Sequence, residues 1–169
     1  MQLIYLFSVW LHILAAAVWI GGMVFVALVL VPVIRRPETQ GFAASIVHLT
    51  GLRFRSVGWI CLALLFLTGV FNLLYRGFAP ADLWNGRLWE SSFGAALALK
   101  LLFFSAVLVL SGLHDFAIGP RATALWRTDP NSPASRRLRR QASWIGRLNL
   151  LLALLIVALG ITLVRGWSW

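Results

Sequence analysis

Two ionisable residues interrupt long apolar stretches of this chain, His12 in the first stretch and Lys100 in the third. An ionisable side chain inside the hydrocarbon layer of a bilayer costs on the order of 2.5–3.5 kcal/mol, so it indicates a functional site or a buried pair. His12 stands about nine residues from one end of its stretch and Lys100 about eight from the same end of its own, which places both roughly 12–14 Å deep. We therefore expect the imidazole and the amine at one level, both facing the protein interior.

The neighbours of His12 favour a flat and bulky partner. Ala16 and Trp19 follow His12 on one helical face. Ala15 and Gly22 adjoin this face, and small residues beside an aromatic ring leave a slot that a macrocycle would fill. Neutral imidazole is the commonest metal ligand in proteins and a usual axial ligand of haem iron. The sequence thus predicts a haem b site with His12 as the iron ligand, and a hydrogen bond from His12 to another helix is the simpler alternative.

Lys100 is predicted to belong to the same site, either as the second iron ligand or as the catalytic residue that handles protons. The alternative is a lysine that extends to the membrane surface, but from this depth the side chain would have to reach a long way. The aromatic residues predicted to wall the macrocycle are Trp19, Phe103 and Phe104.

Two further histidines stand near the other membrane surface and form a second candidate site. His114 follows Lys100 by nearly four helical turns, about 21 Å, so it cannot share an iron with His12. It is a candidate metal ligand, and Asp115 would orient its imidazole for proton uptake, although a solvated pair at the interface explains both residues as well. His48 would pair with His114 or contact a cofactor's propionates, and an interfacial histidine without a site is the alternative.

The composition requires a membrane protein. Of the 169 residues 60% are hydrophobic and 12% charged, about half the charged share of a soluble domain. Four stretches are long enough to span a bilayer, at about residues 3–33, 57–75, 92–116 and 145–164. We predict an all-α, polytopic four-helix bundle forming a single transmembrane domain over residues 1–169. Ser91-Ser92 is expected to cap the third helix and Gly119-Pro120 to end it.

The connections between these stretches carry most of the net charge of +10. Because basic residues cluster in segments 35–55 and 117–144, these two connections are predicted to lie on the cytoplasmic side of the inner membrane. Both termini are then predicted to lie on its outer side. Short basic connections between spans indicate contact with anionic lipid, which argues against a nucleic-acid partner. Residues 37–51 are expected to extend the second helix along the interface, and residues 129–133 to form a mobile loop. The tryptophans expected at the outer interface are Trp84, Trp89, Trp167 and Trp169.

A weak internal repeat relates the two halves of the chain. Residues 11–14 (Leu-His-Ile-Leu) resemble residues 99–102 (Leu-Lys-Leu-Leu), which makes His12 and Lys100 equivalent positions. The second and fourth spans both carry a glycine followed by an Arg-Gly-aromatic ending, at residues 69–78 and 160–167. This predicts two tandem helical hairpins. Chance similarity between apolar segments explains the pattern equally well.

The residues of all four spans resemble a known membrane family. Residues 11–22 (LHILAAAVWIGG), 53–55 (RFR) and 67–73 (LTGVFNL) resemble the CopD family, and residues 99–121 resemble its short stand-alone members. The layout also resembles the HemJ family of four-helix protoporphyrinogen oxidases, whose first-helix histidine and third-helix lysine match His12 and Lys100. The latter resemblance implies haem b, whereas the His114-Asp115-Phe116 segment departs from what that family requires and leaves the reaction open.

The two resemblances imply different functions. The CopD resemblance implies copper resistance or copper transport along a path marked by His12, Met23 and His114, but the chain has two methionines and three histidines and no cluster of either. The HemJ resemblance implies a haem b redox protein, an oxidoreductase that takes electrons from a quinol, a porphyrinogen or a membrane partner. A structural subunit without cofactor is a third reading. The oligomeric state stays open, because the small residues 15–17 and 21–22 suit contacts between protomers as well as within one.

Overall fold

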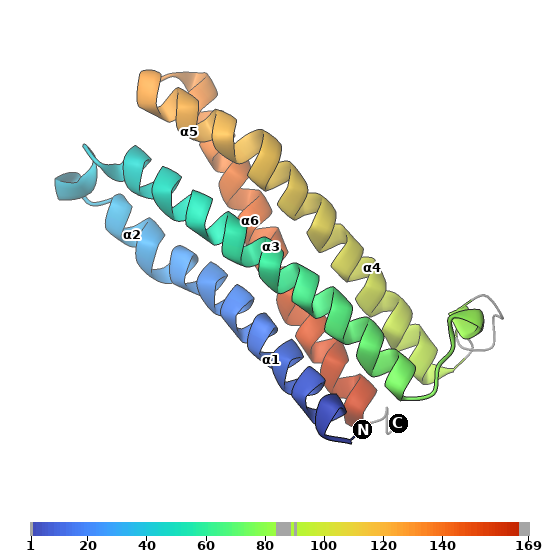
Figure 1. The fold of residues 1–169 in the computed structure, drawn as a ribbon. Helices are drawn as coiled ribbons and strands as arrows, with labels where there is room; N and C mark the ends of the chain where they lie inside the picture. The colour runs from blue at the N-terminus through green and yellow to red at the C-terminus, as the bar shows by residue number, and fades with distance from the viewer. Residues whose placement is uncertain (1, 84–88, 90, 166–169) are drawn as a thin grey trace.

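The protein is a bundle of four long rods, seen in a computed structural model that describes residues 2–83, 89 and 91–165 (Figure 1). The first rod joins α1 (Gln2–Phe25), a π-helical turn η1 (Val26–Leu30) and α2 (Val31–Ile34). The second is α3 (Ala43–Tyr75), preceded by the short 3-10 turn η2 (Pro37–Thr39). The third joins α4 (Ser92–Leu113), a second π-helical turn η4 (His114–Ile118) and α5 (Gly119–Thr128). The fourth is α6 (Pro133–Arg165), and η3 (Pro80–Leu83) lies between the second and third rods.

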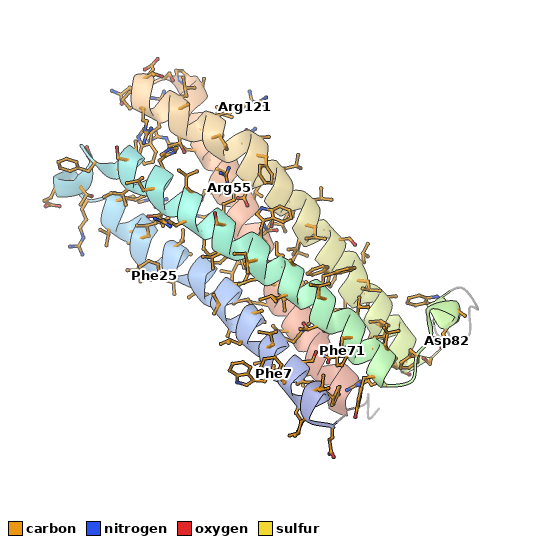
Figure 2. All side chains as sticks on the ribbon, in the orientation of Figure 1. Phe7, Phe25, Arg55, Phe71, Asp82 and Arg121 are labelled. Carbon is orange, nitrogen blue, oxygen red and sulfur yellow. The ribbon has the colours of Figure 1, made fainter. Side chains whose placement is uncertain are left out.

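The predicted all-α, four-span architecture is confirmed. Four helical segments are long and apolar enough to cross a membrane, covering residues 2–34, 43–75, 92–128 and 133–161. Many large apolar side chains point away from the bundle, among them Phe7 and Phe25 of α1 (Figure 2). Outward apolar side chains on helices of this length indicate contact with the acyl chains of a bilayer.

The rods form two antiparallel hairpins, α1 with α3 and α4 with α6. In the first hairpin the rings of Tyr5 and Tyr75 stack with centroids 4.4 Å apart. In the second the side-chain amide of Asn149 donates a hydrogen bond of 2.9 Å to Ser111 Oγ. Residues from both hairpins meet in one buried cluster, which comprises Ala15, Trp19, Cys61, Leu62, Val107 and Ala153.

Close packing of the first hairpin depends on one glycine. A Cβ atom on Gly22 would collide with the Phe54 ring of α3, whereas Gly21 has no atom within 4 Å of that position. Of these two adjacent glycines, Gly22 therefore permits close contact between α1 and α3, whereas Gly21 lies on an open surface.

The third helix does not end at Gly119-Pro120, so that prediction was wrong. The chain continues as α5 to Thr128, because the π-helical turn absorbs the proline. In a π-helical turn each N–H donates to the carbonyl five residues earlier. Gly119 N–H donates to His114 O, and the next such bond would join the nitrogen of Pro120 to Asp115 O. Proline has no N–H to donate, and the Arg55 guanidinium of α3 supplies a donor to Asp115 O at 3.3 Å instead. A side chain of the neighbouring helix thus replaces the missing backbone bond.

Helix α3 begins at Ala43, so residues 43–51 extend the second helix as predicted, and residues 37–39 form the separate turn η2. The fourth helix is longer than expected. Helix α6 begins at Pro133, twelve residues before the expected span, and includes the arginines of segment 136–140. The expected cap at Ser91-Ser92 is confirmed and formed by Ser91, whose hydroxyl accepts a hydrogen bond of 3.0 Å from Gly94 N.

The two hairpins repeat a distinctive local structure. The first rod of each hairpin contains a π-helical turn followed by a proline. The two turns begin at Val26 and His114, 88 residues apart, and the same interval separates Pro32 from Pro120. The same shift separates His12 from Lys100. Because π-helical turns are rare, their recurrence at this shift supports the predicted tandem hairpins, with His12 and Lys100 as equivalent positions.

Both basic connections lie at one end of the bundle and both chain ends lie at the other (Figure 1). Figure 2 shows Arg121 at the first end and Asp82 at the second. This arrangement agrees with the predicted charge asymmetry, and the side of the membrane stays a prediction. Of the tryptophans expected at the outer interface, Trp89 lies in a turn, and Trp84, Trp167 and Trp169 lie outside the described residues.

Candidate functional site

The His12 imidazole lies between α1 and α3, half-buried. Its Nδ1 atom is 2.7 Å from Thr68 Oγ1, and its Cε1 atom would be 3.6 Å from a Cβ added at Gly69. Ala15 and Trp19 are buried on the same face of α1, as the helical spacing predicted. Histidine 12 therefore faces the protein interior and makes the interhelical hydrogen bond considered as its simpler role.

The hydrogen-bond pattern fixes the proton on His12. Thr68 Oγ1 lies 2.5 Å from the backbone oxygen of Leu64, a carbonyl that can only accept. The single hydroxyl proton therefore goes to Leu64, and Thr68 accepts from His12 Nδ1–H. When the imidazole is neutral its lone pair is therefore on Nε2, and no described residue donates a hydrogen bond to that atom. A metal-ligating histidine uses the same arrangement, with the second nitrogen held by a neighbouring acceptor.

Lys100 faces the interior of the second hairpin. Its Nζ atom would be 3.9 Å from a Cβ added at Gly160 of α6. The side chain is half-buried, and within residues 2–83, 89 and 91–165 no carboxylate pairs with it. Arg76, at the end of α3, adds a second positive charge that acts on Lys100.

The burial pattern agrees with the predicted common level of His12 and Lys100, which stays a prediction. His12 precedes Trp19 by seven residues and Lys100 precedes Val107 by seven, and both later residues belong to the common buried cluster. Seven residues correspond to about two helical turns, roughly 10 Å, and return to the same helix face. The charge of Lys100 also acts on the His12 ring. His12 thus lies against α3 of the first hairpin, and Lys100 lies against α6 of the second.

Each ionisable group is faced by a glycine on its partner helix. Gly69 stands beside His12 and Gly160 beside Lys100, so neither partner helix fills the space next to the polar group with a side chain. These are the two glycines that the internal repeat aligned. The structure adds a physical reason for the alignment, because each keeps its hairpin open at the level of the ionisable residue.

One turn nearer the chain ends, two buried polar atoms have no hydrogen-bond partner among the residues that the structure describes. They are Ser8 Oγ of α1 and Asn72 Oδ1 of α3. The antiparallel register that joins Tyr5 to Tyr75 and His12 to Thr68 brings Ser8 opposite Asn72. Unpaired buried polar atoms are costly, so this level of the first hairpin is polar beyond what its own contacts satisfy.

The aromatic residues predicted to wall a macrocycle are buried or partly buried, and Trp19 lies away from the level of His12. Trp19 is 5% exposed and packs against Gly58 of α3, where a Cβ would be 3.7 Å from the indole. Phe104 packs on the buried cluster, and Phe103 is partly buried. Trp19 thus lies two turns below His12, as part of the floor of the site.

The predicted pair of His114 and Asp115 is present at the basic end. His114 Nδ1 lies 2.9 Å from Asp115 Oδ1. Trp59 Nε1–H donates to Asp115 Oδ2 at 3.1 Å, and Arg55 lies over the Phe116 ring, 5.5 Å from its centroid. Neither Trp59 nor Arg55 was predicted as part of this cluster. Glycine at position 119 permits this close backbone turn, because a Cβ atom there would lie only 2.8 Å from His114 O.

His48 does not join this cluster in the described contacts. It lies half-buried on α3, seven residues before Arg55 and so about 10 Å away along the helix axis. Met23 packs against the buried cluster. No three His, Cys, Asp or Glu side chains of the described segments form a group that could hold a metal ion.

Comparisons with known proteins identify the family. Residues 48–163 match the family described as copper resistance protein D, CopD. An uncharacterized protein of Aquifex aeolicus (strain VF5) is 34% identical over 161 residues, which cover 93% of each chain. No solved structure matches this chain. The family match covers three of the four rods and the relative nearly the whole length, so the chain is a multi-pass membrane protein that belongs to the CopD family.

Proposed function

We propose that this protein is a haem b-binding membrane redox protein with His12 as an axial ligand. One observation carries the proposal: the Nδ1–H of His12 is given to Thr68, and Thr68 gives its own proton to Leu64. The Nε2 lone pair is therefore left for a ligand in the membrane interior. An imidazole held in this way is prepared to bind a metal centre.

The number of protein ligands favours haem over a bare metal ion. The four porphyrin nitrogens occupy most of the iron's coordination sphere, so one or two side chains suffice. A copper site built by the protein alone needs more imidazole, thiolate or thioether ligands. Such a group is not found among the described residues, whereas His12 with Lys100 supplies the smaller set that haem requires.

The charges at this level suit an anionic cofactor. Arg76 is positive and Lys100 is positive when protonated, and Lys100 has no carboxylate partner in the described part of the chain. The two propionates of haem b are negative and would offset these charges. We propose that Lys100 acts as the second ligand or as the proton-handling residue, with Trp19 forming the floor of the site.

The residues of the chain would hold the bound haem and transfer protons, and the haem would exchange electrons. Haem b supplies one-electron redox chemistry when bound. His12 would fix its position through Thr68, and Lys100 would donate or accept a proton at Nζ. Electrons would come from a quinol, a porphyrinogen or a membrane partner. His114, with its Nδ1 held by Asp115, would exchange protons with the solvent at the basic end.

Absorption spectroscopy tests this proposal. Protein purified from haem-replete cells should show a Soret band that shifts on reduction with dithionite. His12→Ala should lose this band, whereas His48→Ala, which removes a histidine remote from the site, should keep it. A colourless wild-type protein, or equal loss in both variants, would refute the haem site.

Copper handling is the second candidate, and the family description favours it. Metal analysis of the same preparation separates the two. A colourless protein that retains about one copper per chain, and loses it in His12→Ala or His114→Ala, would support copper binding and overturn the haem proposal. A colourless preparation without metal would leave the bundle as a structural subunit.

We further propose that the basic end faces the cytoplasm of the inner membrane, with both chain ends outside. Clustering of the basic connections at one end of the bundle supports this orientation. Labelling of single cysteines introduced at Gln40 and at Ala79, in a Cys61→Ala background, tests it. An impermeant reagent applied from outside should reach position 79 and not position 40.

A further inference from the structure

An open groove lies at the basic end of the bundle, between η4 and α6. Its volume is about 540 Å³, and its lining residues are Ile118, Arg137, Arg140, Gln141, Trp144 and Ile145. This volume is within the range of roughly 300–1,000 Å³ that is usual for small-molecule sites. One end of the groove is basic, and the other is apolar and leads along α6 toward the membrane-spanning part. The groove is therefore amphiphilic along its length.

The arginines of α6 divide into two pairs with different contacts. Arg136 and Arg139 donate hydrogen bonds to the backbone oxygens of Asn131 and Pro130, and Arg139 also lies 4.6 Å from the ring centroid of Trp126. This pair holds the turn that connects α5 to α6. Arg137 and Arg140 line the groove, and in the described part of the chain they have no hydrogen bond or ion pair. Two guanidinium groups are thus available to a ligand.

We propose that this groove binds an anionic phospholipid, with the phosphate held by Arg137 and Arg140. The guanidinium group matches a phosphate in shape and charge. The apolar end, formed by Ile118, Trp144 and Ile145, would receive the start of an acyl chain. The proposal depends on the membrane-spanning fold and not on the haem site.

The lining residues also account for selection of an anionic headgroup. None of them is acidic, so the groove offers no carboxylate to the ammonium of a zwitterionic lipid. A choline group would instead need an aromatic face, and the guanidinium of Arg147 already lies 5.5 Å from the ring centroid of Trp144. Trp144 is 58% exposed, as expected for an indole at the headgroup level.

Native mass spectrometry of the detergent-solubilised full chain tests the proposal. Phosphatidylglycerol and phosphatidylcholine are added separately, and bound lipid is counted. Wild type should bind phosphatidylglycerol more tightly, and R137Q/R140Q should weaken that binding by about thirtyfold, because each arginine contributes at the membrane surface. R35Q/R36Q is the matched control, since it removes the same charge from the same end of the other hairpin.

Three results would overturn the proposal. Equal weakening in R137Q/R140Q and R35Q/R36Q would mean that the general surface charge attracts the lipid. Equal binding of the two lipids by wild type would exclude selection of an anionic headgroup. Displacement by millimolar inorganic phosphate would show that the groove binds free phosphate. Trp144→Ala, which keeps the net charge, should weaken phosphatidylglycerol binding as well, and helicity by circular dichroism checks that each variant is folded.

Discussion

Thr68 offers the sharpest test of the proposed site, because it contacts Nδ1 of His12, the ring nitrogen that would not bind the cofactor. Thr68→Val keeps the shape of the side chain and removes the acceptor that lies 2.7 Å from His12 Nδ1. Thr68 is 6% exposed, so solvent cannot replace the lost acceptor. The imidazole would then lose the bond that fixes both its orientation and its tautomer.

The expected loss follows from the role of that bond. Removing the partner that orients a ligating histidine lowers metal affinity by about 10–100-fold, which corresponds to about 1.4–2.7 kcal/mol. Thr68→Ser is the matched control, because serine keeps a hydroxyl that can donate to Leu64 O and accept from His12. It should bind haem within about threefold of wild type, a difference of less than one kcal/mol.

Haem-free protein is titrated with haemin in detergent, and the Soret band is followed in the oxidised and dithionite-reduced states. The affinity for haemin should fall in the order wild type, Thr68→Ser, Thr68→Val. If Thr68→Val bound as tightly as wild type with the same reduced spectrum, the hydrogen bond would have no part in ligation. If Thr68→Ser were as weak as Thr68→Val, the effect would come from packing.

Two further predictions concern the packing that positions the site. Gly22→Ala should destabilise the protein by about 1–3 kcal/mol, because its Cβ would collide with Phe54, whereas Gly21→Ala should change stability by less than about 0.5 kcal/mol; unfolding in increasing dodecyl sulfate measures both. Arg55→Met should cost about 1 kcal/mol, because it leaves the Asp115 carbonyl without its donor. Pro120→Ala restores a backbone N–H and should therefore stabilise Arg55→Met more than it stabilises wild type. Equal stabilisation of both in the double-mutant cycle would contradict the idea that Arg55 replaces the missing backbone donor.

The inward direction of His12 and Lys100 could be predicted because the cost of an ionisable group in lipid acts on each residue alone. Helical periodicity then gave the face, and the burial of Trp19 and Val107 agrees with it. The partner Thr68 could not be found in this way. Its position opposite His12 depends on the register between two helices, which is set by contacts such as that of Gly22 with Phe54. Periodicity within one helix contains no information about register between helices.

The error at Pro120 has a related cause. The rule that proline ends a helix considers only the backbone of that helix, in which the missing N–H leaves a carbonyl unpaired. Here the π-helical turn selects Asp115 O as the unpaired acceptor, and Arg55 of α3 reaches it. The sequence showed Arg55 as one of several basic residues in a connection, so it was interpreted as a determinant of orientation. Its structural role becomes visible when two helices are considered together.

The asymmetry of the internal repeat bears on how many sites the bundle can form. The two hairpins share π-helical turns, prolines and the glycine that faces the ionisable group, yet one hairpin presents an imidazole and the other an amine. Thr68 orients the imidazole, and the residue before Gly160 is Leu159, which has no hydroxyl to do the same for Lys100. On the proposed function, the oriented metal ligand is therefore His12 of the first hairpin, and the second hairpin contributes Lys100. On the proposed function, the repeat supplies two halves of one site between the hairpins, and a second haem would have no oriented ligand.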